Sequence, residues 1–177
     1  MILRPAHLRR ILGDLVYGTD DDTLAEVVGR RLAATGATVA LAESCTGGLL
    51  GKLITDVPGA SRYFLRGWIT YSNEAKTADL GVPGDLIEKH GAVSEQVAQA
   101  MAQGARRRAG TTHAIAITGI AGPEGGTEQK PVGLVYISVD SPDGTETLRY
   151  VFQADRDNVR LFAALRGLNM LRRRLGN

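Results

Sequence analysis

The apolar run at residues 37–42, ATVALA, constrains the fold more than any other segment of this chain. It contains no charged side chain, and a polar stretch with two glycines follows directly at 43–48. Short apolar runs that end at turn residues are typical of strands buried on both faces, and such strands occur in parallel sheets covered by helices. We therefore expect this segment to be an inner strand of an α/β domain.

Helix and strand patterns alternate along the rest of the chain. Thr23 with Glu26 three residues later forms a capping-box pattern, which predicts a helix that ends at Gly36. The run SPDG at 141–144 predicts a hairpin turn between two late strands. This order of elements predicts an α/β sandwich with a mixed sheet. The other expected helices lie at 5–17, from the 43–48 stretch to about 54, at 73–79, at 83–89, from Ser94 onward and at the C-terminus. The other expected strands lie at 62–71 (interrupted at Gly67), 112–118, 131–140 and 146–153.

The bulk composition fits one globular domain. The 177 residues are 44% hydrophobic, and the net charge is only +2, which argues against nucleic acid as the main ligand. We interpret the arginines gathered near both ends as solvated helix faces. The single cysteine, Cys45, excludes an internal disulfide and suits a cytoplasmic protein. Charged residues interrupt 1–17 and no apolar run reaches 18 residues, so we expect neither a signal peptide nor a membrane contact.

Three loops that follow predicted strands carry the residues suited to chemistry, because ligands of open α/β sheets bind at the carboxyl ends of strands. In the first loop, ESCTGG, Ser44 is a candidate nucleophile. The amides of Gly47 and Gly48, at the start of a helix, could hold an oxyanion. Thr46 is a candidate substrate-binding residue. Alternatively, Ser44 and Thr46 only cap the helix, or the neighbouring Cys45 is the nucleophile.

The second loop places Tyr71 at a strand end and Lys76 five residues later. A lysine removed from water can act as a general base if its pKa falls, whereas a solvated helix lysine is the alternative. The third loop starts at Thr118 and is rich in glycine, which suits the binding of a phosphate or sugar through backbone amides, or else a plain flexible connection. Its candidate binding residues are Gly119, Gly122 and Gly126.

Basic residues close to these loops are candidates for binding an anion. Lys130 follows the glycine-rich loop and could add charge toward a phosphate. Arg156 opens the last helix, where the helix dipole disfavours a cation, so it is expected to have an anionic partner, either a ligand or the adjacent Asp155 or Asp157. The three histidines lie outside the loops, which favours serine with lysine or tyrosine over a Ser-His-Asp triad. No cluster has metal-ligand spacing, so we expect neither a metal nor another cofactor.

Several motifs, in order, resemble one family. The strings AESCTGG (42–48), FLRGWITYSNEAK (64–76), HGAVSE (90–95), and ITGIAGPEGGT with KPVGLVYI (117–137) are similar to the C-terminal domain of the competence/damage-inducible protein CinA. The similarity runs from about residue 22 to 165. This family includes stand-alone nicotinamide-nucleotide amidohydrolases. The resemblance implies a compact three-layer α/β/α domain, usually oligomeric.

The resemblance also implies an activity. The carboxamide of nicotinamide mononucleotide (NMN) would be hydrolysed to nicotinate mononucleotide and ammonia, in pyridine nucleotide salvage. By resemblance, the catalytic residues are Ser44, Tyr71, Lys76 and Thr118. An arginine is implied as well, and we favour Arg156 over Arg160.

Longer family members carry a further N-terminal domain, and residues 8–20 resemble the segment that joins the two domains. We therefore expect 1–20 to form a helical extension and 21–177 the amidohydrolase domain. Two other functions remain open: a nucleotide-binding module without catalysis, and a nucleic-acid accessory protein that uses the terminal arginines. Release of ammonia from NMN distinguishes the amidohydrolase from both of these. A steep salt dependence of DNA binding would support the nucleic-acid accessory protein.

Overall fold

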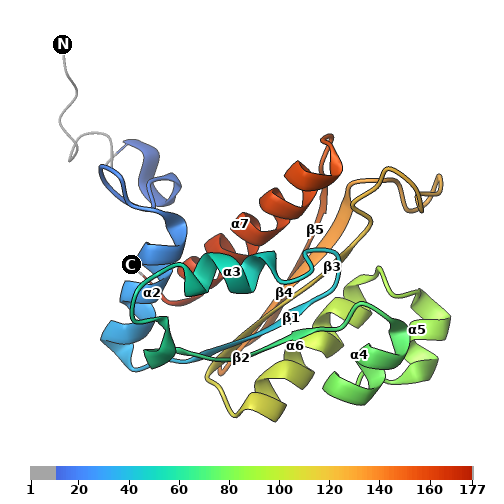
Figure 1. Cartoon of the computed structure of the whole chain (residues 1–177), viewed down its shortest axis with the longest axis horizontal. Coiled ribbons are helices and arrows are strands. Elements are labelled where there is room, and N and C mark those ends of the chain that lie inside the picture. Colours follow the sequence, from blue (N-terminus) through green and yellow to red (C-terminus); the bar gives the residue numbers. More distant parts are fainter. Residues whose placement is uncertain (1–10, 177) are drawn as a thin grey trace.

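The computed structural model describes residues 11–176 and is a three-layer α/β/α sandwich built on one five-stranded sheet (Figure 1). The strand order is β2-β1-β3-β4-β5. β1 pairs in parallel with β2 and β3, whereas β4 pairs antiparallel with β3 and β5. The fold class expected from the sequence is confirmed. The strands are β1 (Val39–Glu43), β2 (Phe64–Ile69), β3 (His113–Gly119), β4 (Leu134–Ser141) and β5 (Gly144–Val151).

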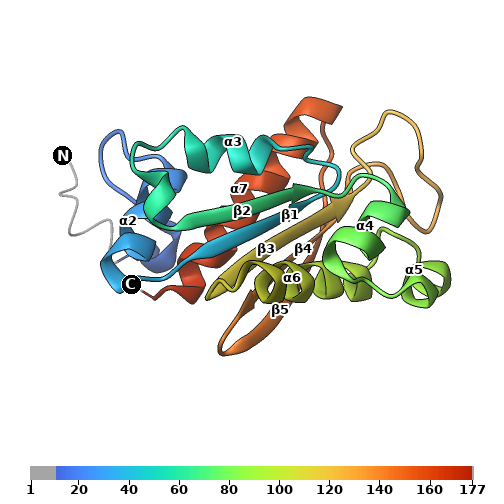
Figure 2. The same cartoon turned by 60° about the horizontal axis from the view of Figure 1, so that its bottom comes forward.

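Helices cover both faces of the sheet, as Figures 1 and 2 show from two directions. Side chains alternate along β1 and β3. Leu41 and Ile115 pack with the first helix layer, while Ala42 and Ala116 pack with the second, where small side chains let the helices lie close to the sheet. The first layer is α2 (Leu24–Thr35), α3 (Leu49–Thr55) and α7 (Arg156–Arg174). The second is α4 (Asn73–Leu80), α5 (Gly84–His90) and α6 (Glu95–Ala109), and two 3-10 turns are η1 (Gly13–Leu15) and η2 (Ala60–Arg62).

Local sequence signals account for the element ends. The capping box at the start of α2 is confirmed, because the Thr23 side chain accepts from the Glu26 amide and the Glu26 carboxylate accepts from the Thr23 amide. Gly36 ends α2 with a φ of 65°, in the left-handed region that glycine tolerates best. The predicted hairpin between β4 and β5 is also confirmed, with Ser141 opposite Gly144.

Two elements differ from the expectation. The helix expected at 5–17 begins outside the described residues; residues 11–12 are helical, and η1 follows instead of a helix that reaches residue 17. Gly13 has a φ of 50°, which is incompatible with a continued right-handed helix. β2 is shorter than the expected 62–71, and Gly67 lies within it without interrupting it.

Candidate active site

The candidate site lies at the carboxyl ends of the three parallel strands. The amide of Ser44 donates to the Ile117 carbonyl at 2.9 Å, and the amide of Thr70 donates to the Glu43 carbonyl at 2.8 Å. This continues the strand register by one residue, so Ser44 lies between Thr70 and Thr118. By the alternation of the strands, all three side chains lie on the sheet face covered by α4, α5 and α6.

Lys76 reaches this point from α4. The Ser72 side chain caps that helix by accepting from the Ala75 amide, which places Lys76 one turn inside it. Lys76 Nζ lies 3.3 Å from Ser44 Oγ, and its side chain is only 1% exposed. The solvated-lysine alternative is therefore wrong. Burial lowers the pKa of the Lys76 ammonium, while Cys45 and Glu74 nearby act in the opposite direction.

Three backbone carbonyls surround the Lys76 amine. Nζ donates to the carbonyls of Thr70 at 2.9 Å, Tyr71 at 3.3 Å and Ser72 at 3.4 Å. A protonated amine has three N–H donors, so these oxygens can accept all of its protons once it has taken one from a serine. The neutral amine keeps a lone pair that the Ser44 hydroxyl can approach. The carbonyls thus stabilise the ammonium form, while burial favours the neutral amine, and the amine can serve as a base because burial prevails and lowers its pKa.

Cys45 is a poor alternative to Ser44. Its side chain belongs to the core between the sheet and α2, α3 and α7, on the face opposite Lys76. Burial raises the pKa of the thiol to about 12, so the reactive thiolate is scarce at neutral pH. The geometry therefore favours Ser44 as the nucleophile.

The Glu43 side chain, only 3% exposed, occupies the start of α3. Its carboxylate accepts from the amides of Gly48 at 3.0 Å, Leu50 at 3.1 Å and Gly51 at 2.8 Å. The amide of Gly47 donates to the Ser44 carbonyl. The expectation that the Gly47 and Gly48 amides are free to hold an oxyanion is therefore wrong, because both already have acceptors.

Capping of α3 by serine or threonine is also wrong, since Gly48 is the N-cap residue and makes no side-chain bond. Two amides in the nucleophile loop, those of Cys45 and Thr46, make no hydrogen bond to another described residue. The hydroxyls of Thr46 and Thr70 are buried and likewise have no partner within residues 11–176. Two backbone amides of the loop and two buried threonine hydroxyls therefore have no partner in another described residue.

Tyr71 and two arginines line the outer edge of the site. Arg156 donates to the Gly122 carbonyl at 2.8 Å and to the exposed Tyr71 hydroxyl at 3.3 Å, so it joins the second and third loops. It makes no ion pair with an acidic residue of the described chain, so the alternative of a surface pair with Asp155 or Asp157 is wrong. Arg160 donates to the Thr46 carbonyl at 2.9 Å, in the nucleophile loop. Both arginines are thus placed at the candidate site.

Thr118 and Lys130 bind the same backbone turn. The Thr118 hydroxyl donates to the Ala92 carbonyl at 2.9 Å. Lys130 Nζ donates to the carbonyls of His90 at 2.7 Å and Val93 at 2.8 Å. Lys130 was expected to extend its charge toward a phosphate, whereas two of its three donors hold this turn. The turn is thus held next to Thr118, which neighbours Ser44 in the sheet register.

Close packing explains why glycine occupies three positions of the third loop. A Cβ on Gly119 would lie 2.7 Å from the Leu134 carbonyl oxygen, and one on Gly126 would lie 2.7 Å from the Val132 nitrogen. A Cβ on Gly122 would meet the Val132 side chain at 2.4 Å. These positions therefore lack side chains because the loop packs against Val132 and Leu134, at and just before the start of β4, and this packing accounts for the glycines without a ligand.

Sequence reasoning missed Glu43 and Thr70. The alternation of side chains along β1 was the signal for Glu43. It places Glu43 on the same sheet face as Val39 and Leu41, toward α3 and away from Lys76. Thr70 shares a face with Ser44 by the same alternation. Among residues 11–176 there is no group of three His, Cys, Asp or Glu side chains that could hold a metal ion. Within that range no helix is long and apolar enough to cross a membrane.

Comparison with known proteins gives concordant matches. The family model of the CinA C-terminal domain matches residues 21–175. A putative competence-damage inducible protein of Symbiobacterium thermophilum is 51% identical over 96% of this chain and 42% of its own length. A CinA-like protein of Anaeromyxobacter dehalogenans is 52% identical over 92% of this chain and 40% of its own. The chain thus spans about two fifths of the length of these relatives.

Solved structures match as well. The competence damage-inducible protein A (ComA) of Klebsiella pneumoniae has a TM-score of 0.84 and 36% identity, covering 87% of this chain and 96% of the other. The competence/damage inducible protein CihA of Agrobacterium tumefaciens has a TM-score of 0.79 and 37% identity, covering 90% of this chain and all of the other.

Proposed function

This chain belongs to the CinA C-terminal domain family, and from that premise we propose that it is an amidohydrolase whose Ser44 attacks the carboxamide of NMN. The observation that carries the proposal is the 3.3 Å approach of the buried Lys76 amine to the Ser44 hydroxyl. Burial of that amine favours its neutral form, which is the form a general base needs. The choice of NMN rests on the motifs that resemble nicotinamide-nucleotide amidohydrolases.

In the first half-reaction, the Ser44 hydroxyl transfers its proton to the neutral Lys76 amine as Oγ bonds to the carboxamide carbon. The carbonyls of Thr70, Tyr71 and Ser72 accept the N–H groups of the resulting ammonium. Lys76 then returns the proton to the leaving nitrogen, and the C–N bond breaks. The products are ammonia and an ester between Ser44 and the nicotinoyl group.

In the second half-reaction, water attacks the ester carbon while Lys76 takes one of its protons. The ester C–O bond breaks and the proton passes from Lys76 to Ser44 Oγ. Nicotinate mononucleotide is released as the carboxylic acid, which then loses its proton to solvent and becomes the carboxylate. Both tetrahedral intermediates carry an oxyanion. The amides of Cys45 and Thr46 suit this role, because they follow Ser44 directly and are not hydrogen-bonded to another described residue. Each such donor typically contributes roughly 10²–10³ in rate.

The phosphate of NMN fits the basic outer edge of the site. Arg156 has no acidic partner among the described residues and bridges Tyr71 and the Gly122 carbonyl. Arg160 lies next to the nucleophile loop and has only a long contact of 3.8 Å with Asp157. A guanidinium that is not neutralised by a carboxylate is available for a charge-assisted bond to phosphate.

A second function, nucleotide binding without catalysis, would use the same arginines. The two are separated by mixing the purified protein with NMN and measuring ammonia and nicotinate mononucleotide. Stoichiometric binding of NMN with no ammonia release above a Ser44→Ala control would leave only the binding function. We further propose that the protein works in the cytoplasm without a nucleic-acid partner, that it forms homo-oligomers, and that residues 21–177 form the catalytic domain after an extension at 1–20.

A further inference from the structure

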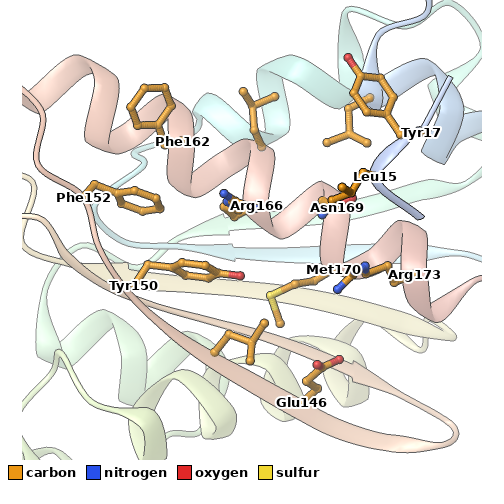
Figure 3. A pocket seen from close by; sticks show the side chains of 13 residues that line it. Leu15, Tyr17, Glu146, Tyr150, Phe152, Phe162, Arg166, Asn169, Met170 and Arg173 are labelled. Atoms are coloured by element: carbon orange, nitrogen blue, oxygen red, sulfur yellow. The ribbon is translucent and has the colours of Figure 1, made fainter. Parts of the chain in front are cut away.

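An apolar groove of about 570 Å³ lies between β5 and α7, on the sheet face opposite Ser44 (Figure 3). Tyr150 of β5 and Phe152, the residue just after this strand, form one wall, and Phe162 and Met170 of α7 form the other. The helix layer that covers the neighbouring strands does not fill the space above β5. The result is an open strip of core-like surface at the edge of the sandwich.

The groove is lined by ordered aromatic contacts. Tyr150 and Phe152 stack with ring centroids 5.5 Å apart, and Phe152 meets Phe162 at 5.8 Å. Leu148 and Phe162 remain 36% and 40% exposed. Exposed apolar side chains that gather in one groove, instead of lying scattered singly over the surface, are typical of a binding site for a partner.

The segment 11–17 beside the groove carries the complementary surface. Leu15 and Tyr17 reach one end of the groove (Figure 3), yet 75% and 43% of their surface stays exposed. Ile11 and Leu12 are also exposed. Six of the ten exposed large apolar side chains within residues 11–176 therefore belong to this segment or this groove: Ile11, Leu12, Leu15, Tyr17, Leu148 and Phe162.

Charges on the two surfaces are complementary as well. Arg166 and Arg173 line the groove, and neither makes an ion pair within the described part of the chain. Arg166 instead lies over the Tyr150 ring at 5.5 Å. Asp20 and Asp21 follow the apolar segment and are exposed, without an ion pair among those residues. An apolar groove with arginines thus faces outward next to an apolar segment that ends in aspartates.

We propose that a second copy of this chain occupies the groove with its segment 11–21, while its own groove receives the same segment of the first copy. Each copy carries both the segment 11–21 and the groove side by side. A two-fold symmetric dimer with an isologous interface requires both surfaces on each copy. The aspartates of one copy then approach the arginines of the other. The inference goes beyond the proposed reaction and does not depend on it.

The first test measures the mass of the full-length protein by sedimentation velocity across a concentration series. Leu148→Glu places a charge in the groove, and Leu12→Asp places one on the segment, so each should weaken the dimer by about tenfold or more. Leu65→Glu is the matched control, because Leu65 is 52% exposed on the opposite edge strand, β2, and should leave the dimer unchanged. A monomeric wild type, or a dimer that survives both substitutions, overturns the proposal.

The second test asks which chain supplies the segment. Leu12→Cys and Leu148→Cys are made in separate, differently tagged chains, and the only native cysteine is buried. Mixing the two under mild oxidation should give a disulfide-linked heterodimer, while either chain alone should not crosslink. If instead a chain carrying both cysteines closes on itself as a monomer and the mixture gives no heterodimer, the segment covers its own groove and the proposal fails.

Discussion

Lys76 Nζ approaches Ser44 Oγ to 3.3 Å although 32 residues separate them in the chain. The contact depends on the sheet, because Ser44 ends β1 while Lys76 lies in the helix that follows the neighbouring parallel strand β2. Two groups that are unreactive in water are therefore held together in a buried position. This contact is the basis of the proposed proton transfer from Ser44 to Lys76.

Ser44→Ala should abolish ammonia release from NMN, with no change in fold, because it removes only one hydroxyl from a loop whose backbone bonds persist. Cys45→Ser should keep most of the activity, since the thiol lies on the other face of the sheet. Steady-state ammonia assays with circular dichroism on both variants provide the measurement. An active Ser44→Ala protein together with an inactive Cys45→Ser protein would reverse the assignment of the nucleophile.

Lys76 should give the reaction a characteristic pH dependence. Its pKa is lowered by burial, and only the neutral amine can take the serine proton. Log kcat/KM should therefore rise with pH and level off above an inflection that lies below the ordinary lysine pKa of about 10.4. Activity is lost as the pH falls through the pKa of the folded protein.

Two variants isolate the proton transfer from the charge. Lys76→Met removes the amine, and Lys76→Arg keeps a cation that does not deprotonate in proteins. Both should lower kcat by about 10² or more, in the range typical of a lost general base. An active Lys76→Arg enzyme, or an inflection at or above the ordinary lysine pKa, would show that Lys76 acts only as a fixed charge.

Local features of this protein were predictable from sequence, whereas contacts across the chain were not. The capping box at Thr23 and the hairpin at 141–144 involve neighbours only, so residue type decides them. Lys130 shows the limit: its position near a glycine-rich loop suggested a phosphate ligand, but its ammonium binds carbonyls 37 and 40 residues earlier. The candidate site was predictable from its motifs, whereas the contacts among its residues became visible only in the fold.

Glu43 should support the nucleophile loop without touching the substrate. Glu43→Gln replaces an acceptor oxygen with a donor facing backbone amides that have no other acceptor. The loss should cost about 1.5–3 kcal/mol in stability, as for hydrogen bonds to charged groups, and should lower kcat because Ser44 is the next residue. Glu26→Gln is the control, since that carboxylate also accepts a backbone amide at a helix start, but only one, and at α2. It should lower stability slightly and leave kcat unchanged, as measured by urea denaturation and ammonia release.

Lys130 distinguishes a structural clamp from a phosphate ligand. If its main role is to hold the turn at 90–93, Lys130→Met should lower kcat/KM for NMN and for nicotinamide riboside by the same factor. A phosphate ligand would affect NMN alone. Parallel kinetics with the two substrates decide between them, and a loss confined to NMN would restore the role expected from the sequence.

Arg156 is the residue on which we expect the discrimination between NMN and its riboside to depend. Aromatic residues, which could stack on the pyridine ring, are only 5% of the chain. We therefore expect the ring to contribute little binding energy compared with the phosphate. A charge-assisted contact contributes about 1.5–3 kcal/mol, which corresponds to an order of magnitude or more in kcat/KM. Binding energy from this remote group also positions the amide against Ser44. Wild-type protein should therefore hydrolyse NMN much faster than the riboside or free nicotinamide.

Arg156→Ala should narrow that gap by slowing NMN hydrolysis and leaving the riboside almost unaffected. Tyr71→Phe is a useful companion, because it removes the hydroxyl that accepts from Arg156 while leaving the guanidinium in place. Tyr71→Phe should change the ratio of kcat/KM for NMN to that for the riboside by less than Arg156→Ala does. Arg160→Ala should slow both substrates, since it releases the Thr46 carbonyl in the nucleophile loop. Similar kcat/KM values for all three substrates in the wild type would refute the phosphate anchor, even with Ser44 established as the nucleophile.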